Sequence, residues 1–445
     1  MIPAPSFCSA LARSCALLAL LPGVQLLLAA DAAPAAPTPP AVSAPAPAAP
    51  DQPAAPDAAP GARRGGGGGR AGGGRGGAMS AEDQAKIAKL ATLPPWKPGV
   101  GDGDYMMVPN STNTPPFSDT NPAYTSAPEN APRDGVPKGK VVAFHLSLAG
   151  SKFFPPGGGG RGGGRGAPGG GATPVAGAVA TDFAPLSREA LHRSEGKGNN
   201  AVERDIYVYI PAGYVAGTPA PLLFCHDSMG MHDNPAAPFL PDILDNMIAD
   251  KRLPPMIAVM VDPSNQRSFE YDTVSGKFAE YVEAEILPVV EQKYNVKFSK
   301  DPDARAVLGG SSGAAAAMSM AWFHTELWHR VLMFSPTFIT FQTDPEIAPR
   351  GAVEYYANFI PNSPVKPLRI WLEVGQNDNG STGSDAGMRN WVFASIHAAE
   401  VLKAKGYHYQ FVYAPLAGHT DRPVRSQTLA PALEWLWKDY KPAAK

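Results

Sequence analysis

The chain has 445 residues and a formal net charge of −2, from 38 Lys and Arg against 40 Asp and Glu. This balance gives no general electrostatic reason to bind nucleic acid or an anionic membrane. Residues 31–60 hold 13 Ala and 10 Pro, and residues 61–77 and 157–171 hold 11 Gly each. Such tracts bury too little apolar surface to form a core, so we expect one folded domain rather than two or three.

Residues 1–30 have the features of an export signal. Arg13 precedes an apolar run from Cys15 to Ala30, which ends in small residues suited to cleavage. A short membrane anchor is the alternative, but the run is short for a span. We therefore expect a periplasmic or secreted protein with no membrane span after signal removal. The mature chain would keep only Cys225, which excludes an internal disulfide.

The next segments differ in composition and predicted order. Residues 31–79 are expected to be a disordered linker, first Ala/Pro-rich and then Gly/Arg-rich. Residues 80–135 are predicted to be an irregular segment that wraps the domain, with one short helix near Ala81–Ala91. The domain itself is predicted over 136–442, with a Gly-rich loop insertion at 157–172. Arg-Gly repeats can bind RNA, but a solvated linker better fits an exported chain of near-neutral charge.

From about residue 204, short apolar runs alternate with longer runs of helical periodicity. This alternation predicts an α/β fold with a mostly parallel sheet, helices on both faces and antiparallel N-terminal strands. Strands are predicted at Asp205–Pro211, Leu222–His226, Ile257–Val261, Ala306–Gly309, Arg330–Phe334, Leu368–Val374 and Tyr409–Tyr413. Helices are predicted at Phe239–Lys251, Gly276–Tyr294, Gly313–His324, Asn390–Lys405 and Gln427–Tyr440. Ligands of such sheets bind beyond the carboxyl ends of the strands, so the loops there are the candidate sites.

One strand-to-helix turn carries a nucleophile motif. Residues 307–315 read as a strand, then Gly-x-Ser-x-Gly, then a helix, which places Ser311 on a very tight turn. Gly309 and Gly313 remove side chains that would collide there. The helix start favours developing negative charge, and the N–H of Ser312 is the first expected oxyanion donor. An ordinary Gly/Ser loop is the alternative interpretation.

A serine nucleophile needs a base, and the base needs an orienting carboxylate. Asp378 follows the end of a predicted strand and His419 lies in the loop before the final helix, in the order Ser, Asp, His. Asp385 is the second choice for the acid, and Glu373, within the strand, is a poorer one. We therefore predict a catalytic triad of Ser311, Asp378 and His419.

Other strand-end residues are candidates for lesser roles. The second oxyanion donor is expected from the loop after Leu222–His226, at Ser228 or alternatively at Asp227. Arg267, Glu270 and Tyr271 follow another strand and are expected to line the substrate pocket, with Trp322 and Trp391 as weaker candidates. Cys225 is interpreted as a small core residue. A metal cluster of His226, Asp227, His232 and Asp233 is disfavoured, since it lacks the spacing of known ligand sets.

These residues resemble a known family. Residues 136–440 resemble the enterochelin esterase and feruloyl esterase-like family of α/β-hydrolases. The likeness rests on five short stretches, at 209–214, 226–227, 285–289, 305–313 and 418–419. The resemblance implies a serine hydrolase of carboxylic esters without a cofactor, acting on siderophore esters or acylated plant polysaccharides. The chain departs from the family pattern in two places. Ser228 stands where the family usually has glycine, and the Gly/Arg-rich insertion at 157–171 interrupts the sequence.

The expected function is therefore an exported serine esterase, with a small-molecule or polysaccharide ester as its substrate and an acylated carbohydrate or a feruloyl-type ester as the first choice. A siderophore esterase and an acyltransferase with the same triad are alternatives. An inert binding protein of the same fold is a further alternative. A complete triad order argues against inertness.

Overall fold

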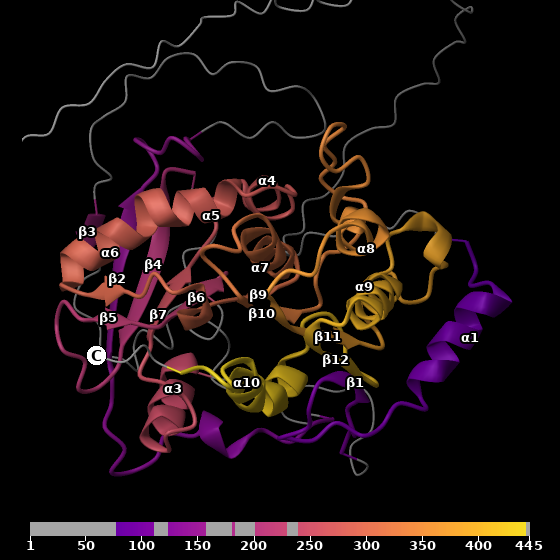
Figure 1. Ribbon diagram of the computed structural model, residues 1–445, viewed down its shortest axis with the longest axis horizontal. Coiled ribbons are helices and arrows are strands. Elements are labelled where there is room, and N and C mark those ends of the chain that lie inside the picture. Colours follow the sequence, from indigo (N-terminus) through magenta and orange to yellow (C-terminus); the bar gives the residue numbers. More distant parts are fainter. Residues whose placement is uncertain (1–76, 111–122, 157–179, 183–200, 229–238, 442–445) are drawn as a thin grey trace, which may run out of the picture. The chain divides into compact units, whose positions relative to one another are not determined.

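The computed structural model describes residues 77–110, 123–156, 180–182, 201–228 and 239–441 (Figure 1). The expected signal at 1–30, most of the linker and the whole Gly-rich insertion at 157–172 lie outside these residues. The strands are β1 Gly103–Met106, β2 Lys140–Ser147, β3 Ala180–Asp182, β4 Glu203–Ile210, β5 Pro219–Ala220, β6 Leu222–His226, β7 Ile257–Val261, β8 Lys297–Phe298, β9 Arg305–Gly310, β10 Arg330–Phe334, β11 Arg369–Gly375 and β12 His408–Ala414. The α-helices are α1 Ala81–Leu90, α3 Leu240–Ala249, α4 Arg267–Tyr271, α5 Lys277–Tyr281, α6 Leu287–Tyr294, α7 Ser312–Phe323, α8 Ile360–Asn362, α9 Trp391–Lys405 and α10 Arg422–Leu436.

The described residues form a ten-stranded sheet in the order β1-β12-β11-β10-β9-β6-β7-β4-β2-β3. The seven strands from β1 to β7 in this order pair in parallel. The strands β4, β2 and β3 pair antiparallel. The predicted α/β architecture with antiparallel N-terminal strands is therefore confirmed.

Helices cover both faces of the sheet (Figure 1). Successive strand residues point to opposite faces, and β9 shows this directly. Val307 belongs to the apolar cluster that contains residues of α5, α6, α7 and α9. Ala306 and Leu308 belong to the other cluster, with residues of α3 and α10. The central strands are therefore buried on both faces, which explains their continuous apolar sequences.

The predicted helix at Gly276–Tyr294 is interrupted in the structure. The α5 and α6 helices are joined by a π-helical turn, Val282–Ile286. Pro288 lies at the start of α6, where it has no N–H to donate to the preceding turn. The wider π turn accommodates the proline without ending the helical path.

Residues 80–135 contain more regular structure than their sequence predicts. Ser80 caps α1, as its hydroxyl accepts from the Asp83 N–H at 3.0 Å. The strand β1 pairs in parallel with β12 and forms an edge of the sheet. Four residues are too few to display an alternating pattern, so β1 cannot be predicted from the sequence. Among the described residues of this segment, α1 and β1 are therefore regular, and β1 belongs to the sheet.

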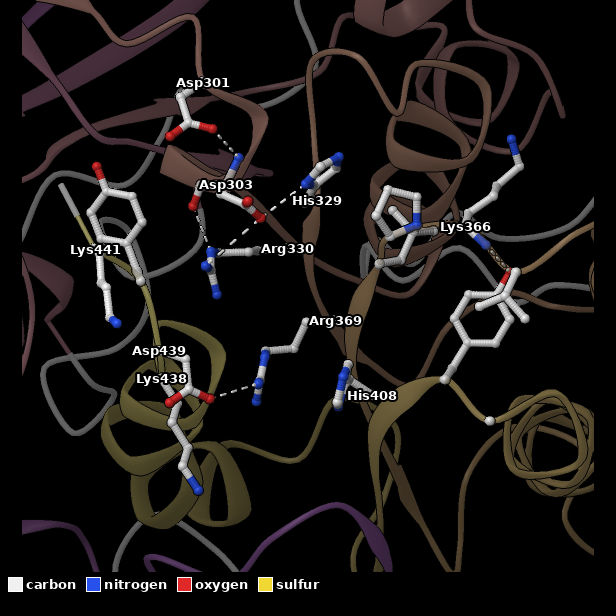
Figure 2. Close-up of a pocket in the computed structure, with 16 residues that line it drawn as sticks. Asp301, Asp303, His329, Arg330, Lys366, Arg369, His408, Lys438, Asp439 and Lys441 are labelled. Carbon is white, nitrogen blue, oxygen red and sulfur yellow. Dashed lines mark hydrogen bonds and ion pairs between the residues drawn. The ribbon is translucent and has the colours of Figure 1, made fainter. Parts of the chain in front are cut away.

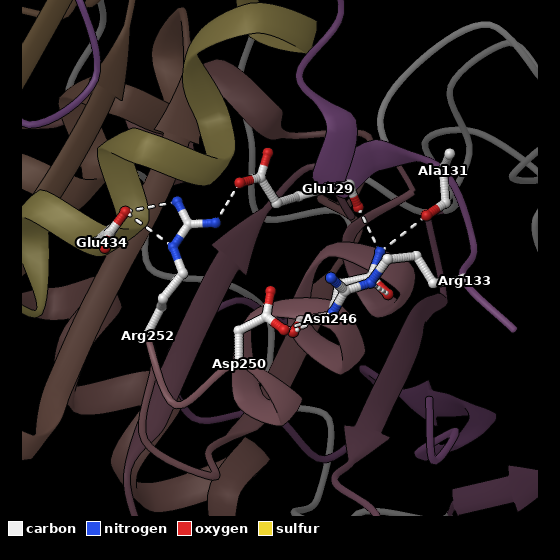
Figure 3. A network of polar contacts seen from close by, with 7 residues as sticks. All are labelled: Glu129, Ala131, Arg133, Asn246, Asp250, Arg252 and Glu434. Atoms are coloured by element: carbon white, nitrogen blue, oxygen red, sulfur yellow. Dashed lines mark hydrogen bonds and ion pairs between the residues drawn. The ribbon is translucent and has the colours of Figure 1, made fainter. Parts of the chain in front are cut away.

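Polar contacts hold the segment around Glu129 and Ala131 against α3 and α10 (Figure 3). Asn246 of α3 donates its side-chain amide to the carbonyls of Glu129 and Ala131, both at 2.8 Å. Arg252 forms ion pairs with Glu129 and with Glu434 of α10. Three segments distant in the sequence are thereby joined at one place.

A cavity of about 790 Å³ lies at the amino ends of the strands (Figure 2). Arg330, Arg369 and His408 are the first residues of β10, β11 and β12, and they stand in register across the sheet. Arg330 donates to the carbonyl of Leu436, and Arg369 donates to that of Trp435 at 3.3 Å. Both arginines therefore satisfy carbonyls in the last turn of α10, a favourable place for a cation.

A buried ion pair joins β4 to α4. Arg204 donates to both carboxylate oxygens of Glu270, at 2.8 and 3.1 Å, and to the carbonyl of Asp262 at 3.0 Å. Both side chains are fully buried. The pair is well hydrogen-bonded, so removing one partner would leave a buried and uncompensated charge.

We predict that Glu270→Gln lowers the free energy of unfolding by about 3–5 kcal/mol, because Arg204 then keeps a buried charge without its counter-ion. Chemical denaturation of the full chain measures this change. The control is Glu280→Gln on α5, where the side chain is 53% exposed and a change within about 0.5 kcal/mol is expected. Equal effects of the two substitutions would contradict the structural role of the pair.

Candidate active site

Ser311 stands on the turn between β9 and α7, with φ 57° and ψ −124°. This backbone conformation is rare for a residue with a side chain, and such strain is found at functional turns. Two hydrogen bonds hold it: the Ser311 N–H donates to the carbonyl of Phe334 at 2.9 Å, and the Ser311 carbonyl accepts from the Thr337 N–H at 3.2 Å. The neighbouring strand β10 and the loop after it therefore fix the serine.

Two glycines make this turn possible. A Cβ added to Gly309 would lie 2.2 Å from the carbonyl carbon of Gly313. A Cβ added to Gly313 would lie 2.8 Å from Oδ2 of Asp227 and 2.9 Å from Cβ of His226. The end of β6 therefore packs directly against the first turn of α7, and only glycine fits at the two contacts.

The three residues of the predicted triad lie together. His419 Nε2 is 2.8 Å from Ser311 Oγ, and His419 Nδ1 is 2.5 Å from Asp378 Oδ1. Asp378 is 2% exposed, and its Oδ1 also accepts from the Asn379 N–H at 2.7 Å. Such a chain allows the imidazole to take the hydroxyl proton while the buried carboxylate stabilises the resulting cation.

The loops that carry the acid and the base begin at adjacent strand ends. Asp378 follows β11, and His419 follows β12, the next strand in the sheet. Trp391, at the start of α9, places its ring edge-on to the His419 ring, with the centroids 5.9 Å apart. The sequence places Trp391 and Trp322 among the weaker pocket candidates. Trp322 is buried against Tyr355 and Phe359, in the core.

The two other candidates for the acid do not contact His419. Asp385 is 2.6 Å from Nε2 of His397 on α9. Glu373 is buried within β11, and burial raises the pKa of its carboxyl to about 8. Of the three candidate carboxylates, Asp378 is therefore the one that contacts His419.

The expected second oxyanion donor requires a correction. The Ser228 N–H donates to the carbonyl of Val261 at 3.1 Å, and Ser228 is 1% exposed, so this amide is engaged in the sheet. Asp227 and Ser228 both have positive φ, 57° and 43°, which shifts the ladder bond by one residue. Among the described residues, none accepts from the Asp227 N–H. Asp227, the alternative in the sequence analysis, therefore fits the role better.

The expected pocket residues divide into one that lines the site and two that do not. Arg267 lines a cavity of about 250 Å³ together with Ser311 and His419. Glu270 is buried in its pair with Arg204, and Tyr271 is 0% exposed. Glu270 and Tyr271 are therefore corrected to core residues. The sequence places these residues in an open loop after a strand. They lie instead in the short helix α4, which buries Glu270 and Tyr271 in the core.

Sequence analysis misses two residues of this cavity, Thr420 and Arg425. Both lie after His419, close to the start of α10. The helix is predicted to start at Gln427, but Asp421 caps it and Pro423 occupies its first turn. An Asp followed closely by Pro is a helix-start signal, and it would have placed Arg425 at the mouth of the site.

Two further side chains near the turn, those of Cys225 and His226, are fully buried. Cys225 is a free thiol in β6, and burial raises its pKa. Burial lowers the pKa of His226 to about 3, so its ring is neutral at physiological pH. In the described part of the chain, no group of three His, Cys, Asp or Glu residues is placed to hold a metal ion. His232 and Asp233 of the disfavoured metal cluster lie outside that part.

Comparison with known proteins identifies the family. Residues 200–436, more than half of the chain, match the family described as putative esterase. The chain belongs to this family. Its described residues have the mostly parallel α/β sheet set out above. Among curated proteins, none matches the sequence.

Several solved structures are similar to this chain. An enterobactin esterase from Shigella flexneri shares 18% identity at a TM-score of 0.38, over 59% of this chain and 65% of that one. A ferulic acid esterase from Anaeromyces mucronatus, in complex with ferulic acid, shares 14% identity at a TM-score of 0.43, over 72% and 97% of the two chains. This chain thus spans less than two thirds of the length of the enterobactin esterase. In its described residues, no helix is long and apolar enough to cross a membrane.

We predict that Gly309→Ala destabilises the protein by about 1–3 kcal/mol, because the added methyl group overlaps the backbone of Gly313. Thermal or chemical unfolding measures the loss. Gly387→Ala is the matched control, since a Cβ there has no neighbour within 4 Å. If both substitutions are tolerated equally, the close contact between β9 and α7 is not required.

Proposed function

We propose that the chain is an exported serine esterase that hydrolyses a carboxylic ester, an acylated carbohydrate or a feruloyl-type ester, through a Ser-Asp-His triad. The observation that carries the proposal is the continuous hydrogen-bonded chain from Ser311 through His419 to Asp378. Export is supported by the sequence of residues 1–30 alone. No cofactor is needed for this chemistry.

In the first half of the reaction, His419 Nε2 takes the proton from Ser311 Oγ as that oxygen attacks the ester carbonyl. Asp378 holds the imidazole by Nδ1 and stabilises its positive charge. His419 then gives the proton to the departing alcohol oxygen, and the acyl group remains on Ser311 as an ester.

The developing oxyanion requires donors that face the attacked carbonyl. The Ser312 N–H is the first amide of α7 and has no acceptor within the helix. The Asp227 N–H is the proposed second donor, and the close contact of Asp227 with Gly313 brings the two segments together. The N-terminus of α7 adds a favourable partial positive charge.

In the second half of the reaction, a water molecule takes the place of the alcohol. His419 takes a proton from this water as the water oxygen attacks the acyl carbon. His419 then gives the proton to Ser311 Oγ as the carboxylic acid leaves. An acyltransferase would use another alcohol at this step. Product analysis with an added alcohol separates the two reactions.

We predict that Ser311→Ala lowers kcat for 4-nitrophenyl acetate by about 10⁴-fold or more, because the nucleophile is lost. Steady-state hydrolysis by the full chain gives the value. Ser319→Ala in the middle of α7 is the control on the same helix, since its hydroxyl contacts Tyr355 and not the site. Activity that survives Ser311→Ala rejects the nucleophile, and a wild-type chain inactive on every ester favours a binding function.

The choice of the acid is tested by a second comparison. Asp378→Asn should lower kcat by about 10³- to 10⁴-fold, because an amide cannot stabilise the imidazolium as a carboxylate does. Asp385→Asn should have little effect, since Asp385 contacts His397 and not His419. Loss of turnover only in Asp385→Asn reverses the assignment.

The ester itself is identified by comparing substrates side by side. Methyl ferulate, acetylated xylan and a catecholate siderophore represent the three ester classes that the resemblance implies. Preferred turnover of the siderophore would support the alternative substrate, with the triad unchanged.

A further inference from the structure

The cavity at the amino ends of β10, β11 and β12 shares no lining residue with the cavity at Ser311 (Figure 2). These strands run parallel to β9, and Ser311 follows the carboxyl end of β9, so the two cavities lie at opposite ends of the strands. Among the described residues that line the amino-end cavity, five are Lys or Arg, two are His and three are Asp. Positive charge is therefore in excess there, and the proposed reaction makes no use of it.

The arginines lie deeper in this cavity than the carboxylates. The side chains of Arg330 and Arg369 are 7% and 14% exposed, whereas those of Asp303 and Asp439 are 60% and 74% exposed. Figure 2 shows the two guanidinium groups in the space between these aspartates. Water solvates the exposed carboxylates, but a buried cation depends on hydrogen-bond partners within the cavity. The base of the cavity is therefore positive, and its rim carries both signs of charge.

The protein partners of the two arginines leave part of each guanidinium group unused. Arg330 donates to the carbonyls of Asp303, at 2.6 Å, and of Leu436, but its Nη2 lies 4.0 Å from Oδ1 of Asp303, beyond hydrogen-bond distance. Arg369 donates to a carbonyl of α10 at 3.3 Å and to Asp439 at 3.4 Å, which is long for a charged pair. Within the described residues, neither guanidinium makes the two short parallel bonds that arginine forms with a well-placed anion.

The two guanidinium groups are also held in place beside each other. Arg330 and Arg369 are register partners on neighbouring strands. The guanidinium carbon of Arg330 lies 5.2 Å from the centre of the Trp437 ring, and that of Arg369 lies 4.9 Å from the centre of the Trp435 ring. Burial lowers the pKa of Arg330 and the charge of Arg369 lowers it further, whereas Asp303 raises it. An anion between the two groups would offset this repulsion, and the aromatic rings reduce the entropy lost on binding it.

A phosphate group fits this arrangement better than a carboxylate does. A carboxylate has two oxygens, and one guanidinium group can engage both of them. A phosphate monoester has three acceptor oxygens and nearly two negative charges at neutral pH, so it can bridge two guanidinium groups and balance both. The cavity volume of about 790 Å³ is much larger than a phosphate group needs, and it lies in the range of small-molecule sites. The carboxylates at the rim can accept hydrogen bonds from hydroxyl groups on the rest of such a ligand.

We propose that this cavity binds a phosphate monoester of a small hydroxylated molecule, of the sugar phosphate class, with the phosphate group between Arg330 and Arg369. The site is separate from the triad and does not depend on the esterase reaction. Inorganic phosphate offers the same oxyanion without the hydroxylated part, so comparing the two ligands shows which source of phosphate the cavity fits.

Isothermal titration calorimetry of the full wild-type chain compares glucose 6-phosphate with glucose, glucuronate and inorganic phosphate, at a slightly alkaline pH where the phosphate group is a dianion. Glucose 6-phosphate should bind with a Kd of about 1 mM or lower. It should bind at least about 10-fold more tightly than glucuronate, whose carboxylate can fill only one guanidinium group. No binding of glucose 6-phosphate, or equal binding of glucuronate, overturns the proposal. Equal binding of inorganic phosphate overturns the sugar phosphate as the ligand class.

Arg369→Gln should weaken the binding of glucose 6-phosphate by about 10- to 100-fold, the effect of losing one charged hydrogen-bonded contact. Lys300→Gln is the matched control. It removes a positive charge next to Asp301 of the cavity wall, but its own side chain is 71% exposed and does not line the cavity. The control should keep the wild-type affinity. An unchanged affinity in Arg369→Gln contradicts the proposed site.

A second variant separates binding from stability, because Arg369 also binds a carbonyl of α10 and its loss could unfold the chain. Lys438 lines the cavity with an exposed residue, so Lys438→Gln should leave the thermal unfolding temperature unchanged. It should weaken the binding of glucose 6-phosphate by about two- to fivefold, as expected for an exposed charge close to the phosphate. If Lys438→Gln and Lys300→Gln bind the ligand equally well, the cavity is not the binding site.

Discussion

The active-site geometry depends on the contact between β9 and α7. At Gly309 the strand and the helix approach so closely that no Cβ fits, and at Gly313 the helix start is equally close to His226 and Asp227. This contact forces the chain to reverse within one residue, and that residue is Ser311 with its positive φ. Packing energy from the rest of the core therefore maintains a local conformation that an isolated peptide would avoid.

The same contact orders the neighbouring loops. Because Gly313 has no side chain, Cβ of His226 and the carboxylate of Asp227 can pack against it. The end of β6 therefore contacts the start of α7. Asp227 is held in turn by Arg267 from α4. The next strand ends, at β11 and β12, supply Asp378 and His419 from the other side. The site is thus assembled beyond the carboxyl ends of the parallel strands.

The sequence predicts well those features that local pattern determines. The Gly-x-Ser-x-Gly turn and the order of Ser311, Asp378 and His419 follow from strand ends and glycines, and the structure brings these three side chains together. The α/β alternation likewise predicts the sheet and its helices. Strand β1 is not predicted, because its four residues are stabilised by their partner β12 and not by their own pattern.

The predictions that the structure corrects depend on the backbone conformation or on the direction in which a side chain points. Ser228 is misassigned because successive positive φ angles turn its amide into the sheet, a conformation that no residue type there announces. Glu270 is misassigned because its partner Arg204 is distant in the sequence. Arg425 is overlooked because the start of α10 is placed several residues too late. Each error arises where tertiary contacts decide a conformation that the local sequence leaves open.

The edge strand β1 also affects how far the chain can be shortened. The Gly77 carbonyl accepts from the Ser384 N–H at 2.9 Å, in the loop between Asp378 and α9. Asp104 of β1 forms an ion pair with Lys403 of α9 at 2.9 Å. A shortened chain that starts at residue 136 would lose these contacts and would expose the backbone of β12 as an open edge, which favours aggregation. Described residues before 136 therefore contribute contacts to the domain, although they precede the first residue that matches the family.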